Sequence, residues 1–261
     1  MDLDLSGRTA LVSGSTAGIG LATASGLAKQ GAEVWVNGRT RSRVDSAIAT
    51  VIAAFPNARL HGVAADLATA DGAADVARVV PALDILVNNL GGVGARKPFD
   101  ELDDADWRHV FALNVLSGVR LARQYLPGMR ARNWGRIIFV SSESALQIPS
   151  EFPHYGAAKA AVIAVARGVA ETLVGTGVTV NSVLPGPTLA EGFSRRIAAD
   201  GRSVEEFSRD FFEQSRPTSL IRRLAEPEEV ANMIVYLCTP AASATHGAAL
   251  RVDGGVVKSA F

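Results

Sequence analysis

Short apolar runs alternate with longer amphipathic stretches along most of the chain. Seven of the runs are rich in β-branched residues and mostly free of polar interruptions, as expected of strands covered on both faces. They are Thr9–Val12, Glu33–Val36, Leu60–Ala64, Ile85–Val87, Arg136–Val140, Val178–Val183 and Ala248–Val252. Segments with helical spacing lie between them, among them Ile19–Gln30, Arg41–Phe55, Asp103–Tyr125, Tyr155–Val174 and Pro227–Leu237. This alternation predicts an α/β fold, a doubly wound parallel sheet with helices on both faces.

One segment breaks the rhythm. Between Leu189 and Leu220 the chain is charged and irregular, and its phenylalanines are spaced like the apolar faces of two short helices. The segment follows the sixth predicted strand, where open α/β sheets place their binding crevice. We therefore expect a single domain spanning residues 1–261, with a substrate lid at about residues 189–220.

Composition and charge exclude several function classes. Hydrophobic residues make up 48% and charged residues 20% of the chain, which is typical of a globular protein with a sizeable core. Lys and Arg together number 26, as do Asp and Glu, so no net field favours nucleic acid or an anionic membrane. The uncharged stretch Thr9–Ala28 is interrupted by glycines, which suits a strand, a turn and a helix better than a membrane span. A single cysteine, Cys238, and an acidic start without a signal pattern predict a cytoplasmic protein.

A glycine-rich turn joins the first predicted strand to the first helix, Gly14-Ser15-Thr16-Ala17-Gly18-Ile19-Gly20. Glycines allow a phosphate to approach the backbone closely, and the helix N-terminus offers free N–H groups. The second strand ends at Val36-Asn37-Gly38-Arg39, with no acid before Asp45 to hold a ribose 2′-hydroxyl. Because a guanidinium suits a 2′-phosphate, Arg39 favours NADP(H) over NAD(H), although it could be only a solvated loop cation.

Tyr155 and Lys159 lie four residues apart in a predicted helix and so share one face. A nearby cation favours the phenolate, which would lower the high pKa of a tyrosine toward the range useful for acid–base catalysis. Ser142 ends a predicted strand upstream, where its hydroxyl can hold a substrate oxygen. Asn114 lies among apolar residues, so its amide either braces the fold or holds a water for function.

The order and spacing of these residues strongly resemble the short-chain dehydrogenase/reductase family, a family with the Rossmann-type fold. The resemblance covers Leu5 to Gly255 and rests on one set of motifs: Gly14-x-x-x-Gly18-Ile19-Gly20, Asn88-Asn89-Leu90-Gly91, Asn114, Ser142, Tyr155-x-x-x-Lys159, Asn181 and Pro185-Gly186. It implies that Tyr155 is the general acid/base, Lys159 lowers its pKa and binds the nicotinamide ribose, Ser142 orients the substrate oxygen, and Asn114 supports a water-linked proton relay.

The same resemblance implies a cofactor site and an assembly. The cofactor-binding residues would be Gly14, Ser15, Thr16, Gly18, Ile19, Gly20, Arg39, Asp66, Leu67, Asn89, Gly91, Tyr155, Lys159, Pro185, Gly186 and Thr188. Asp66 and Leu67 would flank the adenine, and Gly186 to Thr188 would meet the nicotinamide. Such enzymes commonly assemble as homo-oligomers, tetramers or dimers, with the helices that carry Asn114 and Tyr155 at one interface; intramolecular packing of these helices is the alternative.

Three departures from the family pattern stand out. Ser13 replaces a threonine and keeps a hydroxyl, Leu90 is bulkier than the usual alanine, and Ala190 stands where a threonine is common, so that Thr188 would have to supply that hydroxyl. The four histidines show no metal-ligand spacing with one another, so no metal is expected, although His154 beside Tyr155 could touch substrate.

The sequence thus predicts an NADP(H)-dependent oxidoreductase that acts on CH–OH donors and transfers hydride between the nicotinamide and a carbonyl or secondary alcohol. The apolar lid suggests a 3-oxoacyl thioester or another hydrophobic ketone, unless its phenylalanines only pack the lid down. Arg195 and Arg196 could meet an anionic tail, although exposed arginines usually have no specific role. The alternatives are an NAD-dependent alcohol dehydrogenase with the same residues and a dinucleotide-binding sensor without catalysis. Little chain remains for the separate substrate domain of an epimerase or dehydratase.

Overall fold

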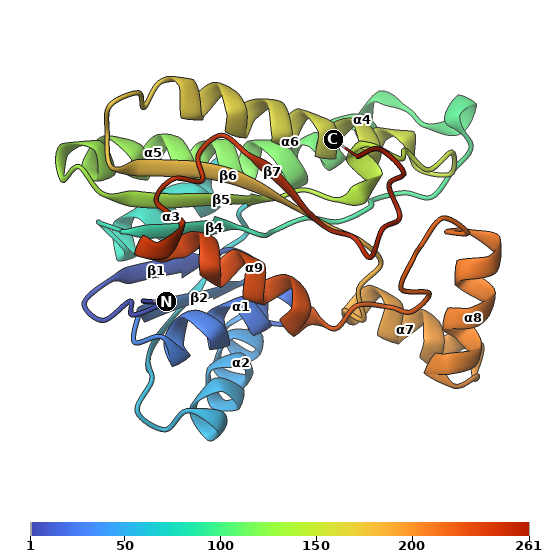
Figure 1. The fold of residues 1–261 in the computed structure, drawn as a ribbon, viewed down its shortest axis with the longest axis horizontal. Coiled ribbons are helices and arrows are strands. Elements are labelled where there is room, and N and C mark those ends of the chain that lie inside the picture. The colour runs from blue at the N-terminus through green and yellow to red at the C-terminus, as the bar shows by residue number, and fades with distance from the viewer. Residues whose placement is uncertain (1, 261) are drawn as a thin grey trace.

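A parallel sheet of seven strands forms the centre of the protein, whose computed structural model describes residues 2–260 (Figure 1). The strands are β1 (Thr9–Val12), β2 (Glu33–Gly38), β3 (Arg59–Ala64), β4 (Ile85–Asn88), β5 (Gly135–Val140), β6 (Val178–Pro185) and β7 (Ala249–Val252). Their spatial order is β3-β2-β1-β4-β5-β6-β7, and every neighbouring pair is parallel. The doubly wound sheet predicted from the sequence is confirmed. Each predicted strand is present, β1 with the predicted ends and the other strands with slightly different ones.

Helices cover both faces of the sheet and bury an apolar core on each (Figure 1). One face carries α3 (Ala70–Val79), α4 (Asp104–Phe111), α5 (Ser117–Ala131) and α6 (Pro153–Glu171). The other carries α1 (Gly18–Lys29), α2 (Arg41–Ala54) and α9 (Pro227–Cys238). Fully buried side chains such as Leu121 of α5 and Leu27 of α1 each contribute about 1.5–3 kcal/mol relative to exposure. The sheet is therefore held rigidly between two cores.

The expectation of one continuous helix over Asp103–Tyr125 is wrong. Helix α4 ends at Phe111, a π-helical segment spans Ala112–Leu116, and α5 follows and continues to Ala131. The Asn114 side chain explains the interruption, because its Nδ2 donates to the Val110 carbonyl, the acceptor that an α-helix would offer to the backbone N–H of residue 114. The spacing of apolar residues cannot predict such a local exchange of hydrogen-bond partners.

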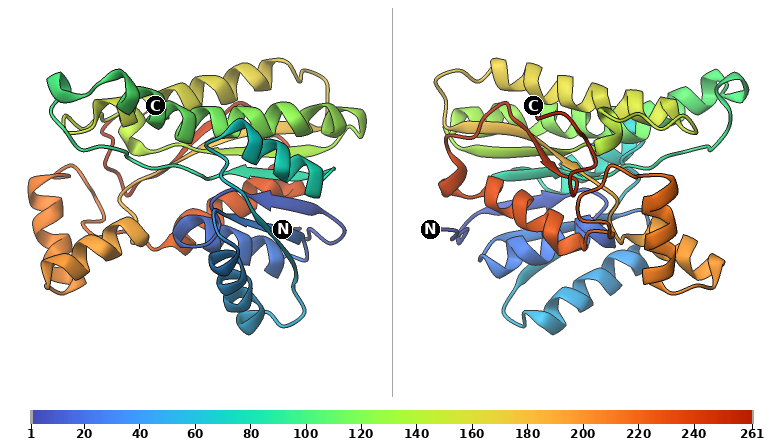
Figure 2. Two further views of the ribbon diagram at one scale, coloured as in Figure 1. Left: turned by 180° about the vertical axis from the view of Figure 1, so that it is seen from behind. Right: turned by 45° about the vertical axis from the view of Figure 1, so that its right-hand side comes forward.

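Two helices, α7 (Glu191–Asp200) and α8 (Val204–Gln214), stand apart from the sheet layers, beyond the strand ends (Figure 2). They have a small apolar cluster of their own, made of Ile197, Phe207, Phe212 and Leu224. Ser203 begins α8 with a capping box, in which its hydroxyl accepts from the Glu206 N–H and the Glu206 carboxylate accepts from the Ser203 N–H. The two short helices predicted in this stretch are thus present.

The strand order reverses between β1 and β4, and this reversal places a crevice at their carboxyl ends. The uncharged stretch from Thr9 to Ala28 forms β1, the glycine turn and most of α1, as expected. Within residues 2–260, no helix combines the length and apolarity needed to cross a bilayer. The same residues contain no group of three or more His, Cys, Asp and Glu that could hold a metal ion.

Candidate active site

Three adjoining hollows lie at the carboxyl ends of the strands. The largest, about 740 Å³, runs along the glycine turn and the start of α7, and we call it the long groove. The second, about 350 Å³, is the central cavity, which Ser142, Tyr155 and Lys159 line. The third, about 240 Å³, is the side cavity between Tyr155 and the α7–α8 segment. Because Val93, Arg96 and Arg196 line all three, we treat them as one continuous site.

In the glycine turn, backbone atoms lie so close to one another that side chains would not fit. Gly14 and Gly18 adopt left-handed φ values of 61° and 53°, which side chains other than glycine rarely tolerate. A Cβ on Gly20 would lie 2.5 Å from both the Gly14 carbonyl oxygen and the Asn89 Nδ2 atom. Helix α1 then begins at Gly18 without a side-chain cap, so its first N–H groups are free to meet an anion in the long groove.

Asn89 and Ser13 fix the turn to the end of β4. The Ser13 hydroxyl accepts from the backbone N–H groups of Asn89 (2.9 Å) and Leu90 (3.0 Å). The Asn89 side chain donates to the Ser13 and Gly14 carbonyls, each at 3.0 Å. The contacts with the two N–H groups require a hydroxyl at residue 13, and a threonine at this position would also supply one.

Asn37 is a structural residue that the sequence reasoning did not single out. Its Oδ1 accepts from the Gly14 N–H at 3.1 Å, and its Nδ2 donates to the Val63 and Ala65 carbonyls. A buried amide at the end of β2 therefore ties the glycine turn to β3. The available signal was an asparagine next to Gly38 at a strand end, but its partners are distant in sequence and could not be identified from it.

The structure brings most of the predicted cofactor residues together. The long groove is lined by Gly14, Thr16, Gly18, Ile19, Gly20, Asn89 and Gly91, and the central cavity by Tyr155, Lys159, Pro185, Gly186 and Thr188. Four predicted residues do not line these hollows: Ser15, Arg39, Asp66 and Leu67. Ser15 is fully buried and its hydroxyl donates to the Val12 carbonyl at 2.7 Å, whereas Arg39 is exposed beyond the turn.

Ser142, Tyr155 and Lys159 converge from two elements. Ser142 follows β5, and its Oγ accepts from the Ser144 N–H at 3.1 Å, which leaves the hydroxyl proton free to donate. Tyr155 and Lys159 lie on α6, with the Lys159 Nζ 5.7 Å from the centre of the Tyr155 ring. The ammonium donates to the Val140 carbonyl at 2.9 Å, and this bond fixes its position under the cavity.

Asn114 braces the loop beside this group. Its Oδ1 accepts from the Gly92 N–H at 3.1 Å, and its Nδ2 donates to the Gly92 carbonyl at 2.9 Å. A Cβ on Gly91 would lie 2.7 Å from the Asn114 Oδ1 and 2.9 Å from the Lys159 Nζ, so only glycine fits between them. The side chain thus braces this loop, and its part in catalysis stays a prediction.

Burial dominates the electrostatics of the pair on α6. Desolvation raises the pKa of Tyr155 to about 12, and its hydrogen bond with Ser142 only partly opposes this. Desolvation also lowers the pKa of Lys159 to about 8. The expected lowering of the Tyr155 pKa by Lys159 is therefore not found, because desolvation is the largest effect on this buried phenol. At neutral pH Tyr155 is a protonated phenol that can donate.

A buried ion pair adjoins Ser142. Arg216 donates from Nε and Nη2 to the Glu143 Oε1, both at 3.0 Å, and the two side chains are only 13% and 6% exposed. Burial raises the pKa of Glu143, and the charge of Arg216 opposes that rise. The pair ties the chain after α8 to the loop after β5. The sequence carries no signal for this pairing, because the partner lies 73 residues away.

Comparison with known proteins agrees with this arrangement. The family model described as enoyl-(acyl carrier protein) reductase matches residues 14–257. The oxidoreductase YvaG of Bacillus subtilis is 44% identical over 265 residues, with both chains fully covered. The D-beta-hydroxybutyrate dehydrogenase of Cupriavidus necator is 33% identical over 261 residues, which cover 97% of this chain and 99% of the relative. The chain belongs to the short-chain dehydrogenase/reductase family.

A solved member of this family has nearly the same fold. The L-sorbose reductase of Gluconobacter frateurii, complexed with NADPH and L-sorbose, superposes with a TM-score of 0.90 at 34% identity, and the match covers 99% of this chain and all of that one. The predicted family and fold are thus confirmed, and the protein is an oxidoreductase of the short-chain dehydrogenase/reductase type.

The departures from the family pattern can now be placed. Leu90 packs over Gly14, since a Cβ on that glycine would lie 3.2 Å from the Leu90 Cα. Thr188 lines the central cavity, and its hydroxyl donates to the Gly186 carbonyl at 2.9 Å. Ala190 lies beside Gly18 at the entrance of the long groove. His154 is fully buried against Trp107 and lines none of the three hollows, so it has no contact with a ligand there.

Proposed function

We propose that this member of the short-chain dehydrogenase/reductase family transfers hydride between NADP(H) and a carbonyl or secondary alcohol. The observation that carries the proposal is that Ser142, Tyr155 and Lys159 line one cavity continuous with the glycine groove. A substrate oxygen in that cavity can meet a hydroxyl and a phenol beside a place for a nicotinamide. The L-sorbose reductase complexed with NADPH supports this cofactor for a protein of the same fold.

The residues of the groove fit a dinucleotide. The uncapped start of α1 and the close approach at Gly14, Gly18 and Gly20 suit a pyrophosphate, which a side chain at these glycines would displace. We assign Lys159 to the nicotinamide ribose and Gly186 and Thr188 to the carboxamide, which their common place in the lining of the central cavity supports. When bound, the nicotinamide supplies the hydride.

The chain's own groups supply the proton. In the reducing direction, Ser142 donates a hydrogen bond that orients the carbonyl oxygen, and Tyr155 gives its phenolic proton to that oxygen as the carbonyl carbon accepts hydride. In the oxidising direction, the Tyr155 phenolate takes the proton back. Asn114 holds the loop at Gly92 next to Lys159, consistent with a supporting role in the proton relay that the family resemblance implies.

The α7–α8 segment is proposed as the substrate lid of a single catalytic domain. Phe193 and Phe211 line the side cavity, whereas Phe207 and Phe212 are buried within the segment. The phenylalanines thus divide between the two roles considered from the sequence, facing the ligand and packing the lid. The two that face the cavity favour a substrate with an apolar part, such as a 3-oxoacyl thioester or another ketone.

A panel of ketones and secondary alcohols tests the proposal. Purified protein with NADPH and each ketone, or with NADP⁺ and each alcohol, is followed by absorbance of the reduced nicotinamide. We expect turnover with at least one carbonyl compound. Binding of the cofactor without turnover of any compound would favour the sensor alternative.

The cofactor preference has its own test. The hydrogen bond from Arg43 is the main cause that lowers the pKa of Glu191, and the charge of Arg39 adds to it, so that charge reaches an acid that lines the long groove. We expect tighter binding of NADPH than of NADH, and Arg39→Ala should weaken NADPH binding by about tenfold or more with little effect on NADH. Arg41→Ala is the matched control, because Arg41 pairs with Asp45 on the surface. Tighter binding of NADH would favour the NAD-dependent dehydrogenase.

We also propose that the protein is a homo-oligomer, a tetramer or dimer. Helices α5 and α6 form a hollow of about 440 Å³ lined mainly by Val119, Ala122, Leu126, Val165 and Val169. This apolar face on α5 and α6 suits a second copy of the chain, because the same face recurs on that copy and a two-fold axis would bring the two together.

A further inference from the structure

Two arginines in the side cavity indicate which chemical group the substrate carries away from its reacting carbonyl. Arg96, in the loop after β4, and Arg196, on α7, both line the side cavity together with Ser142 and Tyr155. Neither belongs to the motifs that identify the family. They come from segments 100 residues apart in sequence, so only the fold brings them to one cavity.

Aromatic rings hold the Arg196 guanidinium in place. Its Cζ lies 5.2 Å from the ring centre of Phe193, 5.3 Å from that of Phe207 and 5.7 Å from that of Phe211. Cation–π contacts of this kind orient a guanidinium without neutralising its charge. The hydrogen-bond donors of Arg196 therefore stay available to a ligand.

Arg96 is held in a similar way, next to the catalytic tyrosine. Its Cζ lies 4.6 Å from the ring centre of Phe152, and that ring makes an edge contact with Tyr155 at 6.0 Å. One ring thus separates the guanidinium from the proton donor. A molecule whose carbonyl is at Tyr155 can therefore extend along the same cavity toward Arg96.

No ion pair neutralises the charge of either arginine in the part of the chain that the structure describes. Over residues 2–260, neither forms an ion pair with a carboxylate, whereas Arg216 in the same cavity is paired with Glu143. Glu151 also lines the cavity but pairs with neither of them. The positive charge of Arg96 adds to burial in lowering the pKa of Arg196, with Asp200 opposing, so the two cations repel each other. An anion between them would relieve that repulsion.

We infer that the substrate is a small keto acid or hydroxy acid, whose carboxylate is bound by Arg96 and Arg196 while its carbonyl or hydroxyl meets Ser142 and Tyr155. The inference rests on the proposed function and names the substrate class of the same site. It favours an organic anion over a neutral sugar or an uncharged ketone. Two guanidinium forks match the geometry of a carboxylate, and each hydrogen bond to it is charge-assisted.

The long groove offers a competing role, because both arginines also line it and could serve the phosphates of the cofactor. Two features favour the substrate. The rings of Phe152 and Phe211, which hold the guanidinium groups, line the side cavity and not the long groove. The anion-binding start of α1 already provides for a phosphate in the groove.

Equilibrium binding separates the two roles and does not require turnover. Acetoacetate and 4-oxopentanoate, each compared with its methyl ester, are titrated calorimetrically into the protein saturated with NADP⁺, where no hydride can be delivered to a ketone. We expect at least one acid to bind about tenfold or more tightly than its ester. In Arg96→Met and Arg196→Met the acid-to-ester ratio should fall toward one, with NADP⁺ affinity unchanged.

Arg209→Met on α8 is the control, since it removes the same charge from the lid at a residue that does not line the side cavity, and it should keep the ratio. Equal binding of acid and ester by the unaltered protein would overturn the inference, as would arginine variants that weaken NADP⁺ and leave the ratio intact. If Arg196→Met loosens the lid, Arg96→Met in its separate loop still decides. Failure of the proposed function would appear differently, as an absence of turnover while the acid-to-ester ratio remains measurable.

Discussion

Tyr155 and Lys159 are both buried, and burial shifts their pKa values in opposite directions. The phenol is held protonated, with a pKa of about 12, and the ammonium loses its proton more easily than in water, with a pKa of about 8. For Lys159 the unfolded chain binds the proton more tightly than the folded protein. The charge therefore costs stability below pH 8, and this cost is relieved as the pH rises toward 10.5, the ordinary value.

A stability series with pH tests this directly. From pH 8 to pH 10, we expect the free energy of unfolding of the unaltered protein to rise relative to that of Lys159→Met. One unit of pKa corresponds to about 1.4 kcal/mol, so the relative gain should be on the order of 2 kcal/mol. Urea unfolding at several pH values measures it. Parallel curves for the two proteins would show that Lys159 is not strained by its burial.

At this scale the sequence predicted well where the chemistry depends on residue type and spacing. Tyr155, Lys159 and Ser142 were expected together and line one cavity. Asn37 and Arg216 were not expected, because their roles depend on partners brought from other strands and helices. The pKa of Tyr155 was expected to fall but is raised. Its rise comes from burial, which depends on the whole fold and cannot be predicted from the neighbouring Lys159 alone.

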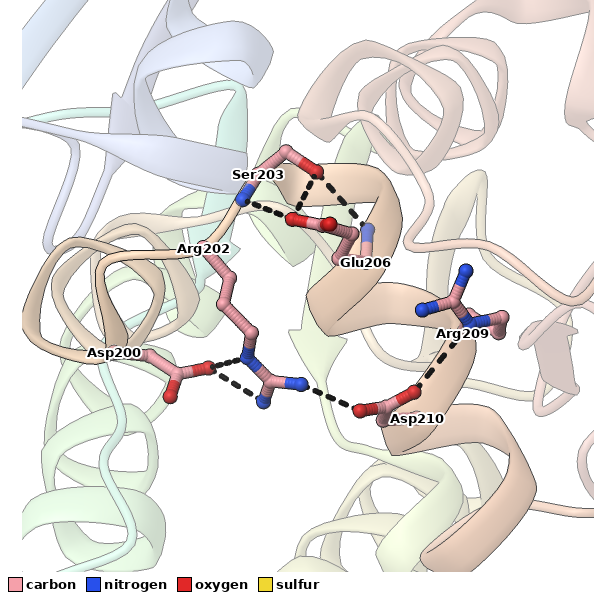
Figure 3. A network of polar contacts seen from close by, with 6 residues as sticks. All are labelled: Asp200, Arg202, Ser203, Glu206, Arg209 and Asp210. Carbon is pink, nitrogen blue, oxygen red and sulfur yellow. Dashed lines mark hydrogen bonds and ion pairs between the residues drawn. The ribbon is translucent and has the colours of Figure 1, made fainter.

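At the scale of elements, a small apolar cluster joins α7 and α8. A network of polar contacts joins the end of α7 to α8, with Arg202 between Asp200 and Asp210 (Figure 3). These side chains are between 33% and 42% exposed, and ion pairs of that kind contribute about 0–1 kcal/mol. Phe212, by contrast, is 1% exposed.

We therefore expect Phe212→Ala to loosen the segment far more than Arg202→Ala. Removal of a buried ring costs about 3–5 kcal/mol of stability, and here the loss should be confined to α7 and α8. Hydrogen exchange of the amides in α7 and α8 should accelerate strongly in Phe212→Ala, with the strands unaffected, and only slightly in Arg202→Ala. Equal exchange in both variants would show that the ion-pair network, not the apolar cluster, holds the lid.

The apolar spacing predicted where helices and strands occur but not every interruption. It gave one helix over Asp103–Tyr125, whereas a π-helical segment divides α4 from α5 around Asn114. That division follows from one side-chain hydrogen bond to the Val110 carbonyl, which leaves no trace in the periodicity. The lid helices were expected as a pair, because their phenylalanines follow helical spacing.

At the scale of the molecule, the alternation of strands and helices was sufficient to predict the parallel sheet. Right-handed crossovers and short connections leave few topologies for such an alternation. The assembly of several copies cannot be predicted from this alternation, because it depends on a surface that the chain itself does not cover. The apolar face of α5 and α6 carries this prediction.

Leu126→Glu on that face should convert an oligomer to a smaller species, since a charge would be desolvated in the interface. Sedimentation of the unaltered protein and the variant measures it. Val79→Glu, a change at an exposed apolar residue of α3, is the control and should leave the mass unchanged. A monomeric unaltered protein, or a variant of unchanged mass, would contradict the proposed assembly.

Proton donation by Tyr155 in carbonyl reduction can be tested by the kinetics of a single turnover. Single-turnover oxidation of bound NADPH by an accepted ketone is compared between the unaltered protein and Tyr155→Phe, which keeps the ring and removes only the hydroxyl. We expect a rate about 10²–10⁴-fold lower in the variant, with NADPH affinity little changed. An unchanged rate in Tyr155→Phe would contradict it.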